Sequence, residues 1–216
     1  MQKKPLILAL LAGLALSGAA HATLIGRDLN GSIGSFEAYY DTDLDITWLA
    51  NTNVNGQMNW ANAMALAANL SYTDGVNTYD NWRLPTTLQP DSSCGNQIGG
   101  VSYGYNCTGS EMGHLFYSEL GGTARLSILT SADPDLAKFT NLLASAYWSA
   151  TEYAPGTGDA WSFSFSGGFQ EEYGEGSQFY ALAVSPGDVA VVPEAETYAL
   201  MLAGLGLIGW RVRRRG

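Results

Sequence analysis

The last two dozen residues constrain this chain more than any other stretch. Val192 and the short polar motif Pro193-Glu194 are followed by an apolar run at residues 198–210 and then by an arginine cluster. The cluster consists of Arg211, Arg213, Arg214 and Arg215. As a helix rising about 1.5 Å per residue, the run covers about 20 Å, less than the ~30 Å hydrocarbon core of a bilayer. The tail therefore predicts a marginal membrane segment whose arginines lie on the cytoplasmic side.

The order of motif, apolar run and arginines resembles a PEP-CTERM sorting signal. In that family the membrane enzyme exosortase is thought to recognise and process the tail, so the resemblance implies exosortase as a partner. One departure is that the family's Pro-Glu-Pro is here Pro193-Glu194-Ala195. An ordinary tail anchor that is never cut stays open as the alternative.

The N-terminus has the three parts of a secretory signal peptide. Lys3 and Lys4 form a charged region, residues 6–16 are apolar, and residues 20–22 offer a small-x-small cleavage site. A retained transmembrane anchor is less favoured because the apolar run is short. We therefore expect signal peptidase to act on the chain and Thr23 to begin the mature protein.

Both ends together predict an exported protein of the cell envelope, cell surface or extracellular matrix, whose C-terminus enters the membrane at least transiently. The expected parts are a signal peptide at 1–22, an exported domain at 23–187, a linker at 188–192 and a sorting tail with an apolar helix at 193–216. Residues 23–192 carry four Lys and Arg against 18 Asp and Glu, a net charge of −14. Such an acidic domain repels phosphates, which argues against a nucleic-acid partner and leaves neutral glycans, cations and cationic partners open.

The two cysteines, Cys94 and Cys107, are expected to form a disulfide. An exported domain folds in an oxidising compartment, and two cysteines without nearby histidines make a poor metal site. In the chain-entropy model, closing a loop of this length is worth about 3 kcal/mol.

The exported segment mixes two hydrophobic periods, which indicates both helices and strands. The expected helices are 59–70, capped by Asn59; 108–120, with Thr108 and Glu111 at capping-box spacing; and 133–143, with Asp133 as cap, Pro134 at its first position and Leu136, Phe139 and Leu143 inward. Strands are expected within 23–38, as a hairpin at 36–49, and at 147–151, 161–165 and 179–184.

Two small groups invite a metal interpretation. Asp41, Asp43 and Asp45 lie in the turn of the expected hairpin, but the positions that an EF-hand reserves for Gly and Glu hold other residues. Solvated turn residues are therefore the favoured interpretation. Glu111 and His114 share a helical face, yet zinc needs further ligands, so this pair is also not favoured as a metal site.

The most specific internal motif is Trp82-Arg83-Leu84-Pro85-Thr86. No other arginine lies within 40 residues on either side, and a partly buried arginine must be paired. We expect Arg83 to bond carbonyl groups or a carboxylate and to lock the loop, in preference to binding a ligand.

The order of this motif and four other segments resembles the Lcl C-terminal-like family. The segments are YDTDLDITWL, the Trp60 helix, WRLPT, YWSAT and the Trp161 strand, and the resemblance spans roughly residues 39–187. RLPT also resembles formylglycine-generating-enzyme-like domains. Both likenesses imply a C-type-lectin-like α+β fold, with two to three helices against a loop-rich, mainly antiparallel sheet. The chain departs at 87–89, where an acidic residue and leucine are usual, and at 181–185, where family arginines are absent.

Two loops are candidates for ligand binding. The segment at 90–106 is expected to be a surface loop, in which Tyr103, Tyr105 and Asn106 offer rings and an amide for a sugar; the alternative is that the rings only pack the loop. An expected acidic loop near 171–175 is the best calcium or ligand candidate, although a solvated acidic rim is the favoured alternative. Its members are Glu152, Asp159, Glu171, Glu172, Tyr173 and Glu175.

Catalytic motifs are absent from the sequence. There is no Gly-x-Ser-x-Gly elbow, no phosphate-binding glycine loop and no histidine pair for zinc. The hypothesis is an exported, non-catalytic surface or exopolysaccharide-matrix protein that binds glycans. The alternatives are a purely structural matrix protein and a tail-anchored degenerate enzyme.

Overall fold

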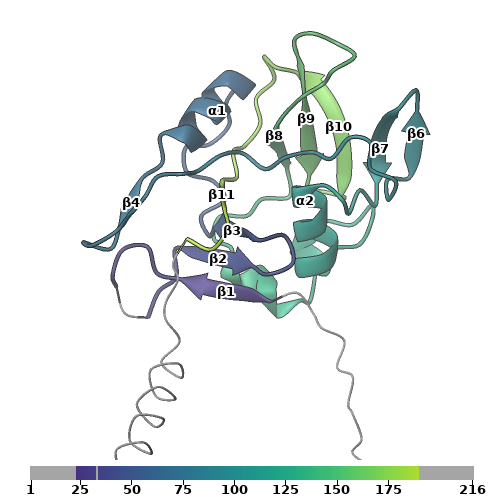
Figure 1. Cartoon of the computed structure of the whole chain (residues 1–216). Helices are drawn as coiled ribbons and strands as arrows, with labels where there is room; N and C mark the ends of the chain where they lie inside the picture. Colours follow the sequence, from purple (N-terminus) through teal and green to yellow (C-terminus); the bar gives the residue numbers. More distant parts are fainter. Residues whose placement is uncertain (1–22, 33, 190–216) are drawn as a thin grey trace, which may run out of the picture.

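The computed structural model describes residues 23–32 and 34–189 (Figure 1). The expected signal peptide and sorting tail, and most of the linker, lie outside these residues. Within the described part of the chain, no helix is both long and apolar enough to cross a membrane.

Two antiparallel sheets form most of the domain. One has four strands in the order β1-β2-β3-β11, the other has five in the order β6-β7-β10-β9-β8, and β4 and β5 form a separate pair. Figure 1 shows the four-stranded sheet at the bottom and the five-stranded sheet at the upper right. The strands are β1 Leu24–Arg27, β2 Ala38–Asp41, β3 Ile46–Leu49, β4 Tyr72–Thr73, β5 Thr78–Tyr79, β6 Asn96–Ile98, β7 Val101–Tyr105, β8 Ala146–Glu152, β9 Asp159–Ser164, β10 Phe169–Gly174 and β11 Val184–Pro186.

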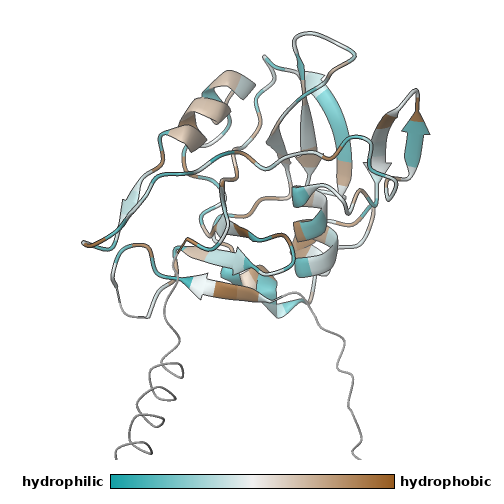
Figure 2. Cartoon of the chain, in the orientation of Figure 1, coloured by the Kyte–Doolittle hydropathy of each residue, from teal (hydrophilic) through white to brown (hydrophobic). Residues whose placement is uncertain are grey.

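Short helices pack on these sheets, which confirms the α+β class. Helix α1, Trp60–Ala68, is apolar along much of its length in Figure 2 and buries Ala63 and Ala67. Its expected cap is confirmed, because the Asn59 side chain accepts a hydrogen bond from the Asn62 N–H. Helix α2, Glu111–His114, continues into the π-helix Leu115–Glu119.

The α2 and π-helix segment fills the space between the two sheets. Its residues Met112, Leu115 and Phe116 belong to one buried cluster with Trp48 of the four-stranded sheet and Phe163 of the five-stranded sheet. A second cluster packs α1 against Trp82, Leu84 and Trp148. The two sheets thus share an apolar core.

The start of α2 differs from its expectation. Ser110, not Thr108, is the N-cap residue, and the Glu111 side chain does not turn back to cap the helix, because it bonds the side chain of Arg83 instead. A long-range ion pair therefore replaces the local capping box.

The expected third helix is only a single 3-10 turn, Pro134–Lys138. The Asp133 side chain caps it as predicted, but the backbone becomes extended at Phe139. Leu142 rather than Leu143 is then buried, because an extended chain places other residues on the core side than a helix does.

Three expected loop or strand boundaries are also corrected. The segment at 90–106 contains the hairpin of β6 and β7, whose pairing adds two strands to the edge of the five-stranded sheet. Residues 171–174 belong to β10 and pair with β9, so most of the expected acidic loop is strand. The closing strand begins at Val184, while Phe179 and Tyr180 form only isolated bridges to Met58 and Tyr147.

The hairpin of β2 and β3 and the edge strand β1 are confirmed. The predicted disulfide between Cys94 and Cys107 is also present, and it brackets the β6–β7 hairpin.

Candidate functional site

A cavity of about 370 Å³ opens where β6, β7 and β10 meet the segment that follows β8. Its lining residues are Ile98, Val101, Tyr103, Tyr153, Phe169, Glu171 and Glu172. We call it the tyrosine pocket. It brings together three residues that the sequence indicated, namely Tyr103, Glu171 and Glu172.

The alternation of β7 explains why its tyrosines face this side of the sheet. Val101, Tyr103 and Tyr105 are half-buried, whereas Ser102 and Gly104 are fully buried on the opposite side. Of the two tyrosines of β7, Tyr103 lines the pocket and Tyr105 does not. Tyr105 packs edge-on against Phe169, with ring centroids 4.7 Å apart, and the Arg125 guanidinium lies 5.1 Å from the Tyr105 centroid.

The acidic side of the tyrosine pocket comes from β10, whose outer part is hydrophilic in Figure 2. Glu171 Oε1 accepts a hydrogen bond of 2.7 Å from the Tyr173 hydroxyl. This bond to a carboxylate, assisted by partial burial, raises the pKa of Tyr173 to about 12. The Tyr173 ring packs against Phe179, 4.9 Å away, so Tyr173 orients Glu171 rather than lining the pocket.

Other predicted ligand residues lie outside the tyrosine pocket. Asn106 adopts a left-handed backbone conformation, and its N–H donates to the Tyr117 hydroxyl. Glu152 pairs with Ala160 at the end of β8, and Asp159 pairs with Gly174 at the start of β9. The predicted acidic cluster is therefore only partly assembled.

Among the described residues, two other groups place three metal-ligating side chains within 4.8 Å of one another. One is Asp91 with Cys94 and Cys107, whose sulfurs are joined in the disulfide. The second is Asp41 with His114 and Glu119. The sequence pointed to Asp41 and His114 separately but not to their meeting, because they come from distant elements.

The aspartates of the β2–β3 turn do not converge as a calcium site. Asp41 is fully buried, and its Oδ1 accepts hydrogen bonds from the backbone N–H groups of Asp43 and Leu44. Asp45 instead accepts a hydrogen bond from the Tyr40 hydroxyl. In this turn the carboxylates thus satisfy local donors.

Glu111 and His114, which the sequence placed on one helical face, have different partners in the structure. Glu111 is held by Arg83, whereas His114 Nε2 lies 3.0 Å from Glu119 Oε1. The hydrogen bond to Glu119, together with the nearby charge of Asp41, raises the pKa of His114 above its usual value, against the opposing effect of burial.

Arg83 is paired with a carboxylate, one of the two kinds of partner that the sequence predicted. Its guanidinium donates two hydrogen bonds to the Glu111 carboxylate, at 2.8 and 2.7 Å, and a third to the Leu84 carbonyl. The Thr86 N–H donates to the same carboxylate at 2.6 Å. The flanking Trp82 and Leu84 side chains are buried, so the motif anchors the loop to α2. Its role is structural, and Glu111 was the residue that sequence reasoning did not connect with it.

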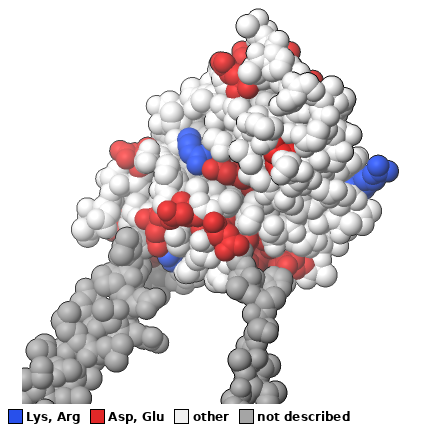
Figure 3. Space-filling model, turned by 45° about the vertical axis from the view of Figure 1, so that its right-hand side comes forward, with Lys and Arg blue, Asp and Glu red and all other residues white. Residues whose placement is uncertain are grey.

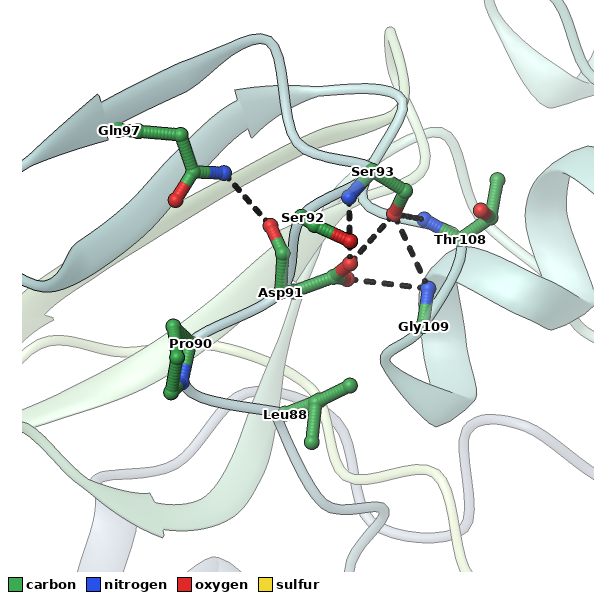
Figure 4. Close-up of a pocket in the computed structure, with 8 residues that line it drawn as sticks. All are labelled: Leu88, Pro90, Asp91, Ser92, Ser93, Gln97, Thr108 and Gly109. Carbon is green, nitrogen blue, oxygen red and sulfur yellow. Dashed lines mark hydrogen bonds between the residues drawn. The ribbon is translucent and has the colours of Figure 1, made fainter.

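A larger cavity, of about 520 Å³, lies beside the disulfide (Figure 4). Its polar groups are used internally: the buried Asp91 carboxylate accepts hydrogen bonds from the N–H and hydroxyl of Ser93 and from the Gly109 N–H. Ser93 Oγ in turn accepts a hydrogen bond from the Thr108 N–H. These bonds tie the cysteine-bracketed segment to the start of α2, so we regard this cavity as a secondary candidate.

The pocket residues Ile98, Tyr153 and Phe169 were not identified from the sequence. Two signals in the sequence could have pointed to them. Phe169 directly follows the predicted Gly167-Gly168 turn, and Tyr153 comes shortly after the YWSAT segment. Their meeting with Tyr103 depends on the pairing of β10 with β7.

Comparison with known families agrees with both resemblances. The model of the Lcl C-terminal domain matches residues 37–185, and that of the PEP-CTERM protein-sorting motif matches residues 191–215. None of the curated proteins gives a significant match. The chain therefore belongs to the Lcl C-terminal domain family and carries a PEP-CTERM motif, which marks it as an exported, cell-envelope-targeted protein that exosortase processes.

Proposed function

We propose that the domain is a non-catalytic glycan-binding module of C-type-lectin-like fold that acts at the cell surface or in an exopolysaccharide matrix. The observation that carries this proposal is the tyrosine pocket, whose lining brings Tyr103 and Tyr153 together with Glu171 and Glu172. Aromatic rings stack on the apolar faces of sugars, and carboxylates accept hydrogen bonds from sugar hydroxyls. Short helices against a loop-rich, mainly antiparallel sheet support the lectin-like assignment.

The position of the tyrosine pocket supports a role in presentation. β1 and β11 belong to the same sheet, and the Arg27 side chain donates hydrogen bonds of 2.6 and 2.5 Å to the Asp188 carboxylate. The two ends of the described domain are therefore tied together in the four-stranded sheet. The pocket belongs to the five-stranded sheet, at the other end of the molecule in Figure 1. A domain attached through its C-terminal tail would thus expose the pocket away from the attachment.

The charge of the pocket favours a neutral glycan over an anionic one. Every residue that lines it is neutral or acidic. Figure 3 shows Asp and Glu gathered in patches on one face, while Lys and Arg occur as isolated groups. Phosphate-bearing or uronic-acid polymers would meet repulsion at such a surface.

The proposal that the domain is non-catalytic rests on how its reactive groups are engaged. The Ser93 hydroxyl is hydrogen-bonded to Asp91, and the His114 ring is hydrogen-bonded to Glu119 within the fold. Neither residue lines the tyrosine pocket.

Glycan binding by the processed protein tests the proposal. Saturable binding to neutral polysaccharides, measured with and without calcium, should weaken at least tenfold in Tyr103→Ala, because the stacking ring is lost. Tyr40→Ala, which removes a tyrosine ring from β2 in the other sheet, is the matched control and should bind normally. Absence of saturable binding to any glycan would contradict the proposal and favour a purely structural matrix protein. Turnover of the bound glycan would instead indicate an enzyme.

A further inference from the structure

The buried cluster of Asp41, His114 and Glu119 has an arrangement that the glycan proposal does not use. Asp41 is fully buried and Glu119 is only 4% exposed. The two carboxylates flank one imidazole: His114 Nε2 lies 3.0 Å from Glu119 Oε1 and 3.9 Å from Asp41 Oδ2. The cluster therefore places two carboxylate groups and one imidazole side by side in the interior of the domain.

A change of helix type brings His114 and Glu119 together. The two residues are five positions apart, and in an α-helix they would point about 140° away from each other. The π-helix at Leu115–Glu119 instead closes an i→i+5 hydrogen bond, from the Leu120 N–H to the Leu115 carbonyl, and turns Glu119 toward His114. π-helical turns within helices are frequent at functional sites.

One atom of the cluster is unsatisfied. Glu119 directs Oε1 at the imidazole, while its buried Oε2 has no hydrogen-bond partner. A buried carboxylate oxygen without a donor is unfavourable unless something else neutralises it. A cation bound between the three side chains would do so.

We propose that Asp41, His114 and Glu119 bind a divalent transition-metal ion, for which Zn²⁺ is the probe. Zinc bonds to imidazole nitrogen and carboxylate oxygen at about 2.0–2.2 Å, which places neighbouring ligands of a tetrahedral site roughly 3.4 Å apart. The separations of 3.0 and 3.9 Å lie on either side of that value. The imidazole ligand favours such an ion over calcium or magnesium, which prefer oxygen alone. On binding, His114 Nε2 gives its proton to solvent and its lone pair to the metal.

The surroundings of the cluster orient its ligands. Trp48 Nε1 donates to Asp41 Oδ2 at 3.1 Å and, with the turn N–H groups on Oδ1, holds that carboxylate in place. Glu119 also lines a cavity of about 450 Å³ with Asp133 and Asp135, whose charges attract cations. The Glu119 side chain is only 1% exposed, and the His114 side chain, at 14%, is the more accessible ligand. Since the ligands join β2 to the α2 and π-helix segment, a bound metal would cross-link the two parts.

The test uses untagged processed protein treated with a chelator and then titrated with Zn²⁺. Wild type should bind one ion per chain by elemental analysis and gain in Tm. Glu119→Gln and His114→Gln should bind at least tenfold more weakly and lose the Tm gain. Asp135 lines the same cavity as Glu119 but is not a ligand, so Asp135→Asn should keep the full stoichiometry. No binding by wild type, or unweakened binding by both ligand variants, would overturn the proposal.

Wild type alone gives a second readout that does not depend on folding of the variants. After residue 22 the chain has a single histidine, His114, so its ring resonances are unambiguous. Nitrogen NMR should show Nε2, and not Nδ1, becoming the metal-bound nitrogen as one equivalent of Zn²⁺ is added. A ring spectrum unchanged at that point would contradict the site.

Discussion

At the scale of single residues, most polar side chains of interest hold the fold rather than face solvent. Arg83 is the clearest case, because its guanidinium meets Glu111 through two parallel hydrogen bonds and leaves about a third of its side chain exposed. Paired charges of this geometry are stronger and more specific than ordinary surface ion pairs.

Arg83→Lys should lower the free energy of unfolding by about 1–3 kcal/mol, because lysine cannot reproduce the two-pronged contact and leaves Glu111 partly unpaired. Urea unfolding measures the change. Arg125→Lys is the control, since Arg125 is exposed and meets Tyr105 only by a ring contact; its effect should stay within about 0.5 kcal/mol. Equal effects of the two substitutions would contradict a special role for Arg83.

Tyr173 should ionise late, with a midpoint near pH 12, because its hydroxyl donates to Glu171. A raised pKa means that the neutral form is favoured in the fold. The stabilisation is therefore complete below the ordinary tyrosine pKa of about 10 and is lost as the pH rises through the folded value. The phenolate absorbance of wild type minus that of Tyr173→Phe measures the midpoint.

Glu171→Gln provides the control for that titration. Removing the negative charge should bring the Tyr173 midpoint back toward 10. A wild-type midpoint already near 10 would show that the hydrogen bond to Glu171 does not persist in solution.

At the scale of elements, close approach of chain segments decides where the helices sit. α2 starts directly against the end of the disulfide-bracketed segment, and Gly113 permits this contact. A Cβ atom at Gly113 would lie 1.8 Å from the Cys107 carbonyl oxygen and 2.8 Å from its carbonyl carbon. These are backbone atoms, which cannot move aside as a flexible side chain can.

Gly113→Ala should therefore destabilise the domain by about 3 kcal/mol or more, or prevent its accumulation. Gly176→Ala is the matched control, because a Cβ atom there meets no heavy atom within 4 Å; it should be nearly neutral. Tm measurements on both variants check the pair. A folded Gly113→Ala protein with wild-type Tm would contradict the close packing of α2 on Cys107.

At the scale of the whole molecule, the acidic domain and the sorting motif have separate roles. The motif at 191–215 directs export and processing, and the domain at 37–185 carries the candidate sites. Because both ends of the described domain lie in one sheet, processing at the tail leaves the tyrosine pocket untouched.

Intact-mass analysis of secreted and membrane fractions, with and without the exosortase, should show loss of the C-terminal segment only when exosortase is present. Ala195→Pro restores the family's Pro-Glu-Pro and should speed loss of the precursor. Lys138→Arg, a conservative change within the domain, is the control and should leave the kinetics unchanged. A mature protein that ends at Gly216 in both strains would support an uncut tail anchor instead.

The sequence by itself determined the features that depend on local pattern or composition. These are the sorting motif, the α+β class, the Asn59-capped helix, the disulfide and a paired Arg83. Only the tertiary structure decided which distant residues meet. Residues 90–106, expected as a loop, contain a pair of strands, and Glu111 forms an ion pair with Arg83. Asp41, His114 and Glu119 meet in one buried cluster. The physical reason is that strand register and a π-helical turn set these contacts, and neither leaves a short-range periodic signal.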